Sequence, residues 1–379
     1  MIHLLGQEKV LQLLQRFILR DELPQSLLFT GPEGVGRKTA ALWFAKALNC
    51  PSLSSEGSPC GHCLSCDKIA RGIHPDVRPI EPMNDKLRRE LQGKTDNEKQ
   101  SSNIKSIKID DIRHLQQEFF RKPLEGRRKV YIVTDAMKMH SEAASSFLKI
   151  LEEPPPNVTF ILVAESPSAL LPTIVSRCQL VMFSLLPKDL IVHHLMEKFG
   201  ISPEKAAKVA SISEGSLGNA IKLLENDKKW DLREEALNFA DKIPSTSLFE
   251  MIESTSRWAP EAKKKRLNGT VEPASRLAEE ESPEEEKNET LLAFLEHLVS
   301  WFRDVLILEE GAPESLLINQ DRLPILMKWR GILNRNLLQE IIYLLLESAR
   351  QINRNANGRL VLQNVFVQMN NKLRILEEM

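Results

Sequence analysis

The stretch SLLFTGPEGVGRKTAALWFAKALNC (26–50) decides the fold class. Its first five residues, SLLFT, form a short and largely apolar run that is typical of a buried strand and stops at Gly31. The residues TAALWFAKALNC (39–50), which follow a glycine-rich turn, have apolar positions at helical spacing. A strand, a glycine-rich turn and a helix in this order are the context that a phosphate-binding loop requires.

The turn itself, GPEGVGRKT (31–39), keeps the glycines of a phosphate-binding loop and changes the residues that carry its chemistry. In the usual form, G-x-x-x-x-G-K-[ST], backbone amides cradle phosphate, the lysine contacts the phosphates and the hydroxyl binds Mg²⁺. Gly31 and Gly36 have the required spacing, and Gly34 lies between them. A turn that needs glycine only for its own shape is the alternative interpretation.

The residues after Gly36 are two cations and a hydroxyl. Arg37 stands at the lysine position, Lys38 at the hydroxyl position and Thr39 one residue late. One helical residue corresponds to about 100° of rotation, so Lys38 cannot take the place of the lysine. Arg37 can still contact phosphate, whereas a cation at the hydroxyl position opposes Mg²⁺. We therefore expect weak nucleotide binding at most, and no hydrolysis of ATP.

Two further apolar runs extend the pattern to a sheet. KVYIV (129–133) and TFILVA (159–164) are both compatible with buried strands, and stretches of helical periodicity separate the strands. Apolar strands that alternate with helices indicate a parallel sheet covered on both faces, so the predicted class is α/β. The helices are expected within 4–20, 39–50, 109–122 and 139–153.

The run KVYIV ends at Thr134 and Asp135, and this is a second departure from an ATPase site. In phosphate-loop ATPases a strand ends in an Asp that helps to hold Mg²⁺, and a Glu that activates water often follows it. Here the single carboxylate of Asp135 stands where two are expected. A strand whose polar end meets solvent would explain the same residues. The two departures together favour an inactive site more strongly than either does alone.

Four of the five cysteines lie close together as C-x₉-C-x₂-C-x₂-C. Four thiolates at this spacing suit tetrahedral Zn²⁺ with every position filled, so the predicted site is structural. An iron–sulfur cluster and unmetallated thiols are the alternatives. His62 and His74 are interpreted as ordinary surface histidines, and Cys178 as a small buried apolar residue. The predicted ligands are Cys50, Cys60, Cys63 and Cys66.

Length and charge limit the remaining possibilities. A chain of 379 residues predicts two or three domains. Its formal net charge of -1 gives no overall field for nucleic acid, so any contact with DNA requires a local patch. No apolar run approaches the length of about 18 residues that a membrane span needs. The start, MIHLLGQEKV, soon reaches charged residues, and we therefore expect a cytoplasmic protein without a membrane partner.

The second half of the chain is expected to be helical. Residues 187–242 have helical periodicity with a break at EGSLG (214–218). The segment 258–290 is charged and contains proline, and it is interpreted as a mobile linker or insert. Residues 291–379 again carry Leu and Ile at helical spacing.

Taken together, these motifs resemble the bacterial clamp-loader ATPases of DNA polymerase III. The resemblance covers most of residues 1–220, and the motifs that carry it are, in order, LLGQEKVL, GPEGVGRKT, the four cysteines, IKIDDIRHL, KVYIVTDA, FLKILEEPPPNVTFILVAE and SRC. The gamma/tau motor of this family has an intact phosphate loop, an Asp-Glu pair and an arginine in its GSL-R motif. In those places this chain has Arg37-Lys38, Thr134-Asp135 and Gly218, so it looks like the delta-prime subunits.

The resemblance implies a P-loop AAA+ fold and a division of labour between subunits. Arg177, of the SRC motif, would be an arginine finger that acts in trans on ATP bound by gamma/tau. The loop residues and Asp135 would form a degenerate nucleotide site, and Zn²⁺ would be a structural cofactor. The implied partners are the gamma/tau and delta subunits of a five-subunit ring, the sliding clamp and primed DNA. The implied domains are an AAA+ domain (1–186) with a zinc module (50–66), a helical lid (187–257) and, after the charged segment, a helical collar (291–379).

Two other functions are compatible with the sequence. The first is an ATP-hydrolysing gamma/tau motor or another AAA+ ATPase, which requires Mg²⁺-dependent turnover by the isolated chain. The second is a zinc-dependent nucleic-acid-binding module, which requires DNA affinity with a steep dependence on salt. The near-zero net charge disfavours the second function.

Overall fold

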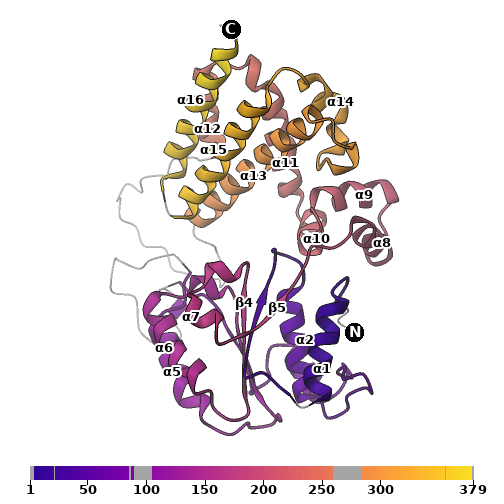
Figure 1. The fold of residues 1–379 in the computed structure, drawn as a ribbon, viewed down its shortest axis with the longest axis vertical. Helices are drawn as coiled ribbons and strands as arrows, with labels where there is room; N and C mark the ends of the chain where they lie inside the picture. Colours follow the sequence, from indigo (N-terminus) through magenta and orange to yellow (C-terminus); the bar gives the residue numbers. More distant parts are fainter. Residues whose placement is uncertain are drawn as a thin grey trace, which may run out of the picture. The chain divides into compact units, whose positions relative to one another are not determined.

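A computed structural model describes most of the chain, in the ranges 4–20, 22–84, 87–88, 105–258, 283–354 and 356–377. The chain divides into two compact units, 1–221 and 222–379, and each is described by itself (Figure 1). Of the predicted charged segment, residues 259–282 lie outside the described part, and a helix begins at Pro283. The division into AAA+ domain, lid and collar stays a prediction.

The first unit is built on a five-stranded sheet in which all strands are parallel, in the order β2-β3-β4-β1-β5. The three interior strands, β1, β3 and β4, are buried along their whole length, and these are the strands that the sequence predicts. The two edge strands were not predicted. The strands are β1 (Ser26–Thr30), β2 (Val77–Ile80), β3 (Lys129–Val133), β4 (Val158–Ala164) and β5 (Gln179–Met182).

Helices cover both faces of this sheet (Figure 1). Successive side chains of a strand point to opposite faces, so Leu27 and Phe29 join a core with helices α1 and α2, while Leu28 joins a core with α5, α6 and α7. The predicted α/β class, with a parallel sheet between two helical layers, is confirmed. The helices are α1 (Glu8–Leu19), α2 (Arg37–Asn49), α3 (Leu64–Ala70), α5 (Ile109–Phe119), α6 (Ser141–Glu152) and α7 (Pro172–Val175), with 3-10 turns η1 (Ala136–Lys138) and η2 (Pro167–Ala169).

Short helices follow β5 and complete the first unit. The backbone N–H of Leu186 donates to the carbonyl oxygen of Gly215 at 2.8 Å, which ties the exit of the sheet to the start of the last of these helices. The chain therefore returns toward the glycine-rich turn after leaving the sheet. The helices are α8 (Lys188–Phe199), α9 (Pro203–Ile212) and α10 (Leu217–Glu225).

The described part of the second unit is helical, as predicted for this half of the chain, and has its own core of large apolar side chains. Trp301, Phe302 and Phe366 are almost completely buried in it, and the rings of Trp258 and Phe294 stack at 4.0 Å. The α-helices are α11 (Asp227–Lys242), α12 (Leu248–Trp258), α13 (Pro283–Glu309), α14 (Leu323–Leu326), α15 (Arg335–Asn353) and α16 (Gly358–Glu377). Four 3-10 turns join them, η3 (Ile243–Ser245), η4 (Glu314–Leu316), η5 (Gln320–Arg322) and η6 (Met327–Trp329).

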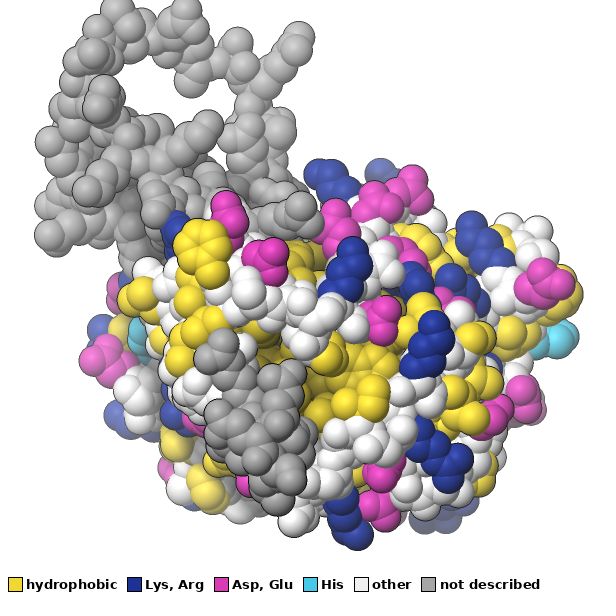
Figure 2. Space-filling view, turned by 90° about the horizontal axis from the view of Figure 1, so that it is seen from above, with side chains coloured by type: hydrophobic (Ala, Val, Ile, Leu, Met, Phe, Trp, Pro, Cys, Tyr) yellow, Lys and Arg dark blue, Asp and Glu magenta, His cyan; other side chains and the backbone are white. Residues whose placement is uncertain are grey.

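The surface shows the balance of charge that the composition indicates. On the face drawn in Figure 2, basic and acidic side chains are interspersed with apolar ones. Within the described ranges, no helix is both long and apolar enough to cross a membrane.

Candidate functional site

The glycine-rich turn lies between the end of β1 and the start of α2, and its glycines are required by local geometry. Gly31, Gly34 and Gly36 have φ angles of 147°, 74° and 99°, in the region that favours glycine. A Cβ atom on Gly34 would lie 2.2 Å from the hydroxyl oxygen of Ser216, and one on Gly31 would lie 2.5 Å from the carbonyl oxygen of Phe183. The packing of the turn therefore requires glycine at these positions, with or without a bound phosphate.

The start of α10 packs directly on this turn. The hydroxyl of Ser216 donates to the carbonyl oxygen of Glu33 at 2.8 Å. The backbone N–H of Gly218 donates to the carbonyl oxygen of Gly34 at 2.9 Å. A Cβ atom on Gly218 would lie 2.7 Å from the Cα atom of Gly34. Position 218 therefore has no room for a side chain, and this packing is a physical reason for the absence of an arginine there.

Arg37 points into the protein. Its side chain is 8% exposed, and Nη1 donates to the carbonyl oxygen of Ala164 at the end of β4. Burial lowers the pKa of Arg37 below its ordinary value, and nearby carboxylates, Glu165 foremost, oppose this effect. The residue at the lysine position of the motif thus donates a hydrogen bond to the last carbonyl oxygen of β4 in its own chain.

Lys38 and Asp135 are brought together by the fold. The ammonium nitrogen of Lys38 lies 3.6 Å from Oδ2 of Asp135, and both side chains are partly exposed. In phosphate-loop ATPases a hydroxyl at the position of Lys38 binds Mg²⁺, and acidic residues stand at the strand end where Asp135 lies. Here a lysine cation faces the carboxylate instead, while Thr39 is half-buried in the first turn of α2. The positive charge of Lys38 would repel a divalent cation placed between the two side chains.

Arg177 lies between α7 and β5 and is held by two contacts. Nη2 donates to Oε1 of Glu152 at 2.7 Å, and Nη1 donates to the carbonyl oxygen of Thr173 at 3.0 Å. The side chain remains 35% exposed. A guanidinium group has five N–H donors, so most of the donors of Arg177 are left for a further acceptor.

Arg177 and the glycine-rich turn lie near opposite ends of two neighbouring parallel strands, β5 and β1, and these ends are called the two edges below. Gln179, the first residue of β5, pairs with Leu27 near the start of β1, and Arg177 precedes it by two residues. The turn follows the other end of β1, after Thr30. Since a strand rises by about 3.3 Å per residue, the five residues of β1 place the two sites more than about 13 Å apart. The backbones of the two sites are therefore separated by most of the length of β1.

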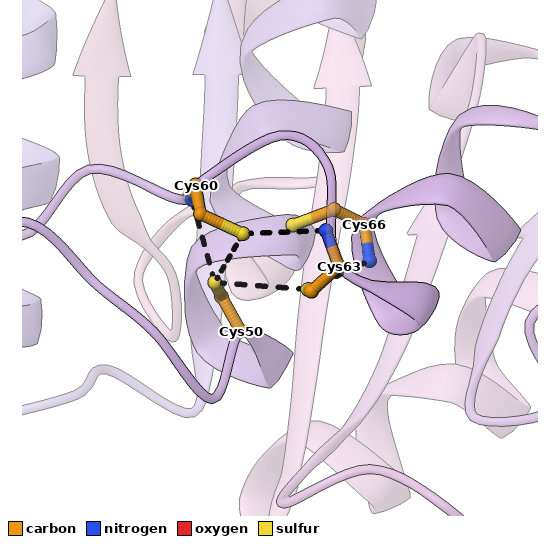
Figure 3. A group of neighbouring side chains, drawn as sticks. All are labelled: Cys50, Cys60, Cys63 and Cys66. Carbon is orange, nitrogen blue, oxygen red and sulfur yellow. Dashed lines mark hydrogen bonds between the residues drawn. The ribbon is translucent and has the colours of Figure 1, made fainter.

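The four predicted metal ligands converge on one point (Figure 3). Their sulfur atoms all lie within 4.8 Å of one another, and Sγ of Cys50 lies 3.5 Å from that of Cys60 and 4.0 Å from that of Cys63. Ligands at about 2.3 Å from a tetrahedral Zn²⁺ are separated by about 3.8 Å. The cluster can therefore hold a metal ion, and four sulfur ligands leave no open position for a substrate.

The backbone of the cysteine cluster prepares the sulfurs for this role. The N–H groups of Cys60, Cys63 and Cys66 each donate to the sulfur of the preceding cysteine of the cluster, at 3.4 Å. Hydrogen bonds from the backbone N–H groups of His62 and Cys63 lower the pKa of Cys60 to about 6. Burial raises the pKa of Cys50 and of Cys66. The sulfurs are arranged as a thiolate site, in which a bound cation would offset the effect of burial.

The histidine interpretation needs one correction. His62 is exposed, as predicted, but His74 is only 3% exposed. Its ring contacts the hydroxyl of Ser65 and accepts from the backbone N–H of Asp76, so it is a buried structural residue rather than a surface histidine. Cys178 is half-buried against one face of the sheet, and burial raises its pKa to about 12.

Two residues with a direct role in these contacts were not predicted from the sequence. Ser216 lies in the EGSLG break and Glu152 in the FLKILEEPPP motif. The motifs drew attention to both segments, but the partners come from distant parts of the chain, and spacing alone does not show them.

Comparisons with known proteins agree with the motif order. The profile of a family described as "DNA polymerase III, delta subunit" matches residues 6–187. The DNA polymerase III subunit delta' of Bacillus subtilis is 32% identical over 259 residues, which are 68% of this chain and 71% of that protein. The chain belongs to the delta' family of DNA polymerase III. The resemblance to the delta-prime subunits that the sequence predicted is confirmed.

Gamma/tau subunits of DNA polymerase III are also similar to this delta' family member. A gamma/tau subunit of Mycoplasma genitalium is 31% identical over 226 residues, which are 58% of this chain and 34% of that protein. Among solved structures, a gamma subunit-related protein of Thermotoga maritima aligns with 96% of this chain and 99% of that one, at 19% identity and a TM-score of 0.43. These two values are too low to support an argument.

Proposed function

We propose that this delta' family member is the subunit of a clamp-loader ring that contributes an arginine finger and does not hydrolyse ATP itself. Its partners are the gamma/tau and delta subunits in a ring of five, and the ring loads the sliding clamp onto primed DNA in the cytoplasm. The observation that carries the proposal is the separation of Arg177 from the glycine-rich turn by the length of β1. A finger at that edge is available to a neighbour's nucleotide and not to its own.

The state of the glycine-rich turn supports the inactive half of this proposal. Carbonyl oxygens of the turn accept from Ser216 and Gly218, Arg37 contacts a strand end, and Lys38 faces Asp135. These contacts satisfy two carbonyl oxygens and both cations of the turn without a nucleotide or Mg²⁺. Nucleotide binding is at most weak. The shape of the turn is set by Gly31, Gly34, Gly36 and Thr39.

The remaining parts of the chain have structural roles in this proposal. The four cysteines bind Zn²⁺, which braces the end of α2 because a closed four-thiolate site contributes folding energy. The lid is 187–257, and the helices of 291–379 form the collar that holds the ring.

Reconstitution tests the proposal. The ring is assembled from gamma/tau, delta and this chain, and clamp loading on primed DNA is measured with and without this chain, together with ATP turnover by the chain alone. We expect loading only when the chain is present and no turnover by the chain alone. Robust Mg²⁺-dependent hydrolysis by the isolated chain would overturn the inactive half of the proposal. Clamp loading at an undiminished rate without the chain would overturn the rest.

A further inference from the structure

The pair formed by Glu152 and Arg177 gives a role to a motif that the proposed function leaves unused. Glu152 is the last residue of α6 and belongs to the LEEPPP stretch, while Arg177 follows α7. The two residues are 25 positions apart in the sequence, and their side chains meet at 2.7 Å. The carbonyl oxygen of Thr173 accepts from the other terminal nitrogen of the same guanidinium, at 3.0 Å.

We propose that Glu152 is the positioning residue for the arginine finger, an inference that rests on the proposed function of Arg177. With one terminal nitrogen fixed by Glu152 and the other by the carbonyl of Thr173, the plane of the guanidinium is set before a neighbour binds. A free arginine side chain loses much rotamer freedom when it is fixed in one geometry. Donors that are aligned in advance of the reaction stabilise developing charge without paying for reorganisation.

Local energetics do not explain this carboxylate. Glu152 ends α6, where the helix carbonyls carry partial negative charge and disfavour an acidic side chain. The side chains of Glu152 and Arg177 are 50% and 35% exposed, and an ion pair with that exposure contributes little to folding. The pair is therefore better explained by the orientation of the finger than by stability.

The chain offers a matched control one residue away. Glu153 carries the same charge in the same motif, and the arginine pairs with Glu152. Glu153→Ala therefore removes the charge of one carboxylate near Arg177 without removing the hydrogen bond. Glu152→Gln removes the charge of the paired carboxylate itself and keeps an acceptor, because the amide oxygen can still accept from the guanidinium.

The test is steady-state ATP hydrolysis by the complete ring with clamp and primed DNA. We expect Glu152→Ala to lower kcat about tenfold because the finger is no longer held, with KM for ATP unchanged. Glu152→Gln should recover most of the lost rate, and Glu153→Ala should behave like the unmodified chain. In an Arg177→Ala background, Glu152→Ala should have no further effect because the two residues act as a unit. Thermal unfolding of each isolated variant checks that its fold is intact.

The outcomes separate this inference from the function on which it rests. If Arg177→Ala abolishes hydrolysis and Glu152→Ala leaves kcat unchanged, the finger stands and the positioning role is wrong. A rise in kcat for Glu152→Ala would show that the carboxylate holds the finger back, which also overturns the inference. If Arg177→Ala leaves hydrolysis by the ring unchanged, both the finger and its positioning residue are wrong.

Discussion

The glycine-rich turn and the Arg177 edge belong to the same sheet, yet their polar groups are used differently. At the turn, Arg37 contacts Ala164 and Lys38 faces Asp135. The two cations that could contact a nucleotide therefore contact groups of their own chain. At the other edge, Arg177 uses two contacts and keeps a third of its side chain exposed. At one end of the sheet the cations are paired within the chain. At the other end Arg177 is fixed by two hydrogen bonds and is partly exposed to solvent.

Under the proposed function, this difference explains how an ATPase fold would lose one function and keep another. Hydrolysis needs the turn, the strand-end acids and Mg²⁺ in one place, so a few changed contacts remove it. An arginine finger needs only a cation that is placed at a subunit boundary, and the opposite edge of the sheet can supply it unchanged. About 13 Å of strand separates the two edges. Residues at one edge can therefore be substituted without a change at the other.

The comparison predicts that two arginines of the chain differ greatly in their effect on the assembled ring. Arg177→Ala should lower its ATP hydrolysis by about 10³-fold or more, the range for an arginine finger. Arg37→Ala should leave the rate within about twofold, since that guanidinium contacts its own strand end. Steady-state hydrolysis measures both, and size-exclusion chromatography confirms that both variants assemble. Equal losses for the two variants would contradict the comparison.

Removal of the metal should disturb the turn and spare the Arg177 edge. Cys50 follows the last residue of α2, and the glycine-rich turn precedes the first residue of this helix. We expect about one Zn²⁺ per chain, lost in Cys63→Ser together with several kcal/mol of unfolding free energy. Hydrogen exchange should then increase along α2 and the turn.

Elemental analysis and hydrogen exchange test this prediction, with Cys178→Ser as the control because Cys178 lies outside the cluster. A metal-free unmodified chain would refute the zinc assignment. Faster exchange around Arg177 in the Cys63→Ser variant would show that the two edges are not independent.

The contact between the turn and the start of α10 predicts a smaller loss of stability. Gly34→Ala forces a left-handed φ of 74° on alanine and places Cβ 2.2 Å from the hydroxyl oxygen of Ser216. We expect a loss of about 2–3 kcal/mol. Gly72→Ala is the matched control, because φ is 71° and nothing lies within 4 Å of a Cβ there, so that the strain alone costs about 1 kcal/mol. Denaturant unfolding measures both, and equal losses would mean that α10 does not close on the turn.

The predictable part of the fold was its interior. The strands at 26–30, 129–133 and 159–164 were recognised because both their faces are buried, so the residues form continuous apolar runs. The edge strands β2 and β5 mix buried and exposed positions without a regular pattern over only four residues each, and β2 contains Pro79. Such short and mixed segments give no periodic signal, and only pairing with a neighbouring strand defines them.

The candidate site divides in the same way. Motif spacing predicted the four cysteine ligands because three of them lie within seven residues of one another, and the structure brings all four together. Motif spacing also identified the changed residues of the turn. It did not predict that Arg37 would turn to Ala164 or that Glu152 would hold Arg177, since those partners are separated by 127 and 25 positions. Contacts over such distances depend on the packed sheet.

The last prediction concerns the two residues of the turn that depart from the consensus, and the expected effect of changing them on activity and stability is the smallest. The double variant Arg37→Lys, Lys38→Thr restores the consensus G-x-x-x-x-G-K-T, yet the isolated chain should still not hydrolyse ATP. The start of α10 would still pack on the turn through Ser216 and Gly218. Thr134 would still leave the strand end with a single carboxylate.

The exposed pair of Lys38 and Asp135, at 3.6 Å, contributes no more than about 0.5 kcal/mol, so its loss should hardly change stability. Mg²⁺-dependent turnover and unfolding of the isolated double variant measure the two effects. The unmodified chain is the baseline, and the gamma/tau motor is the positive control for turnover. Substantial hydrolysis by the variant would show that two side chains alone, and not the closure of α10 on the turn, keep this edge of the sheet inactive.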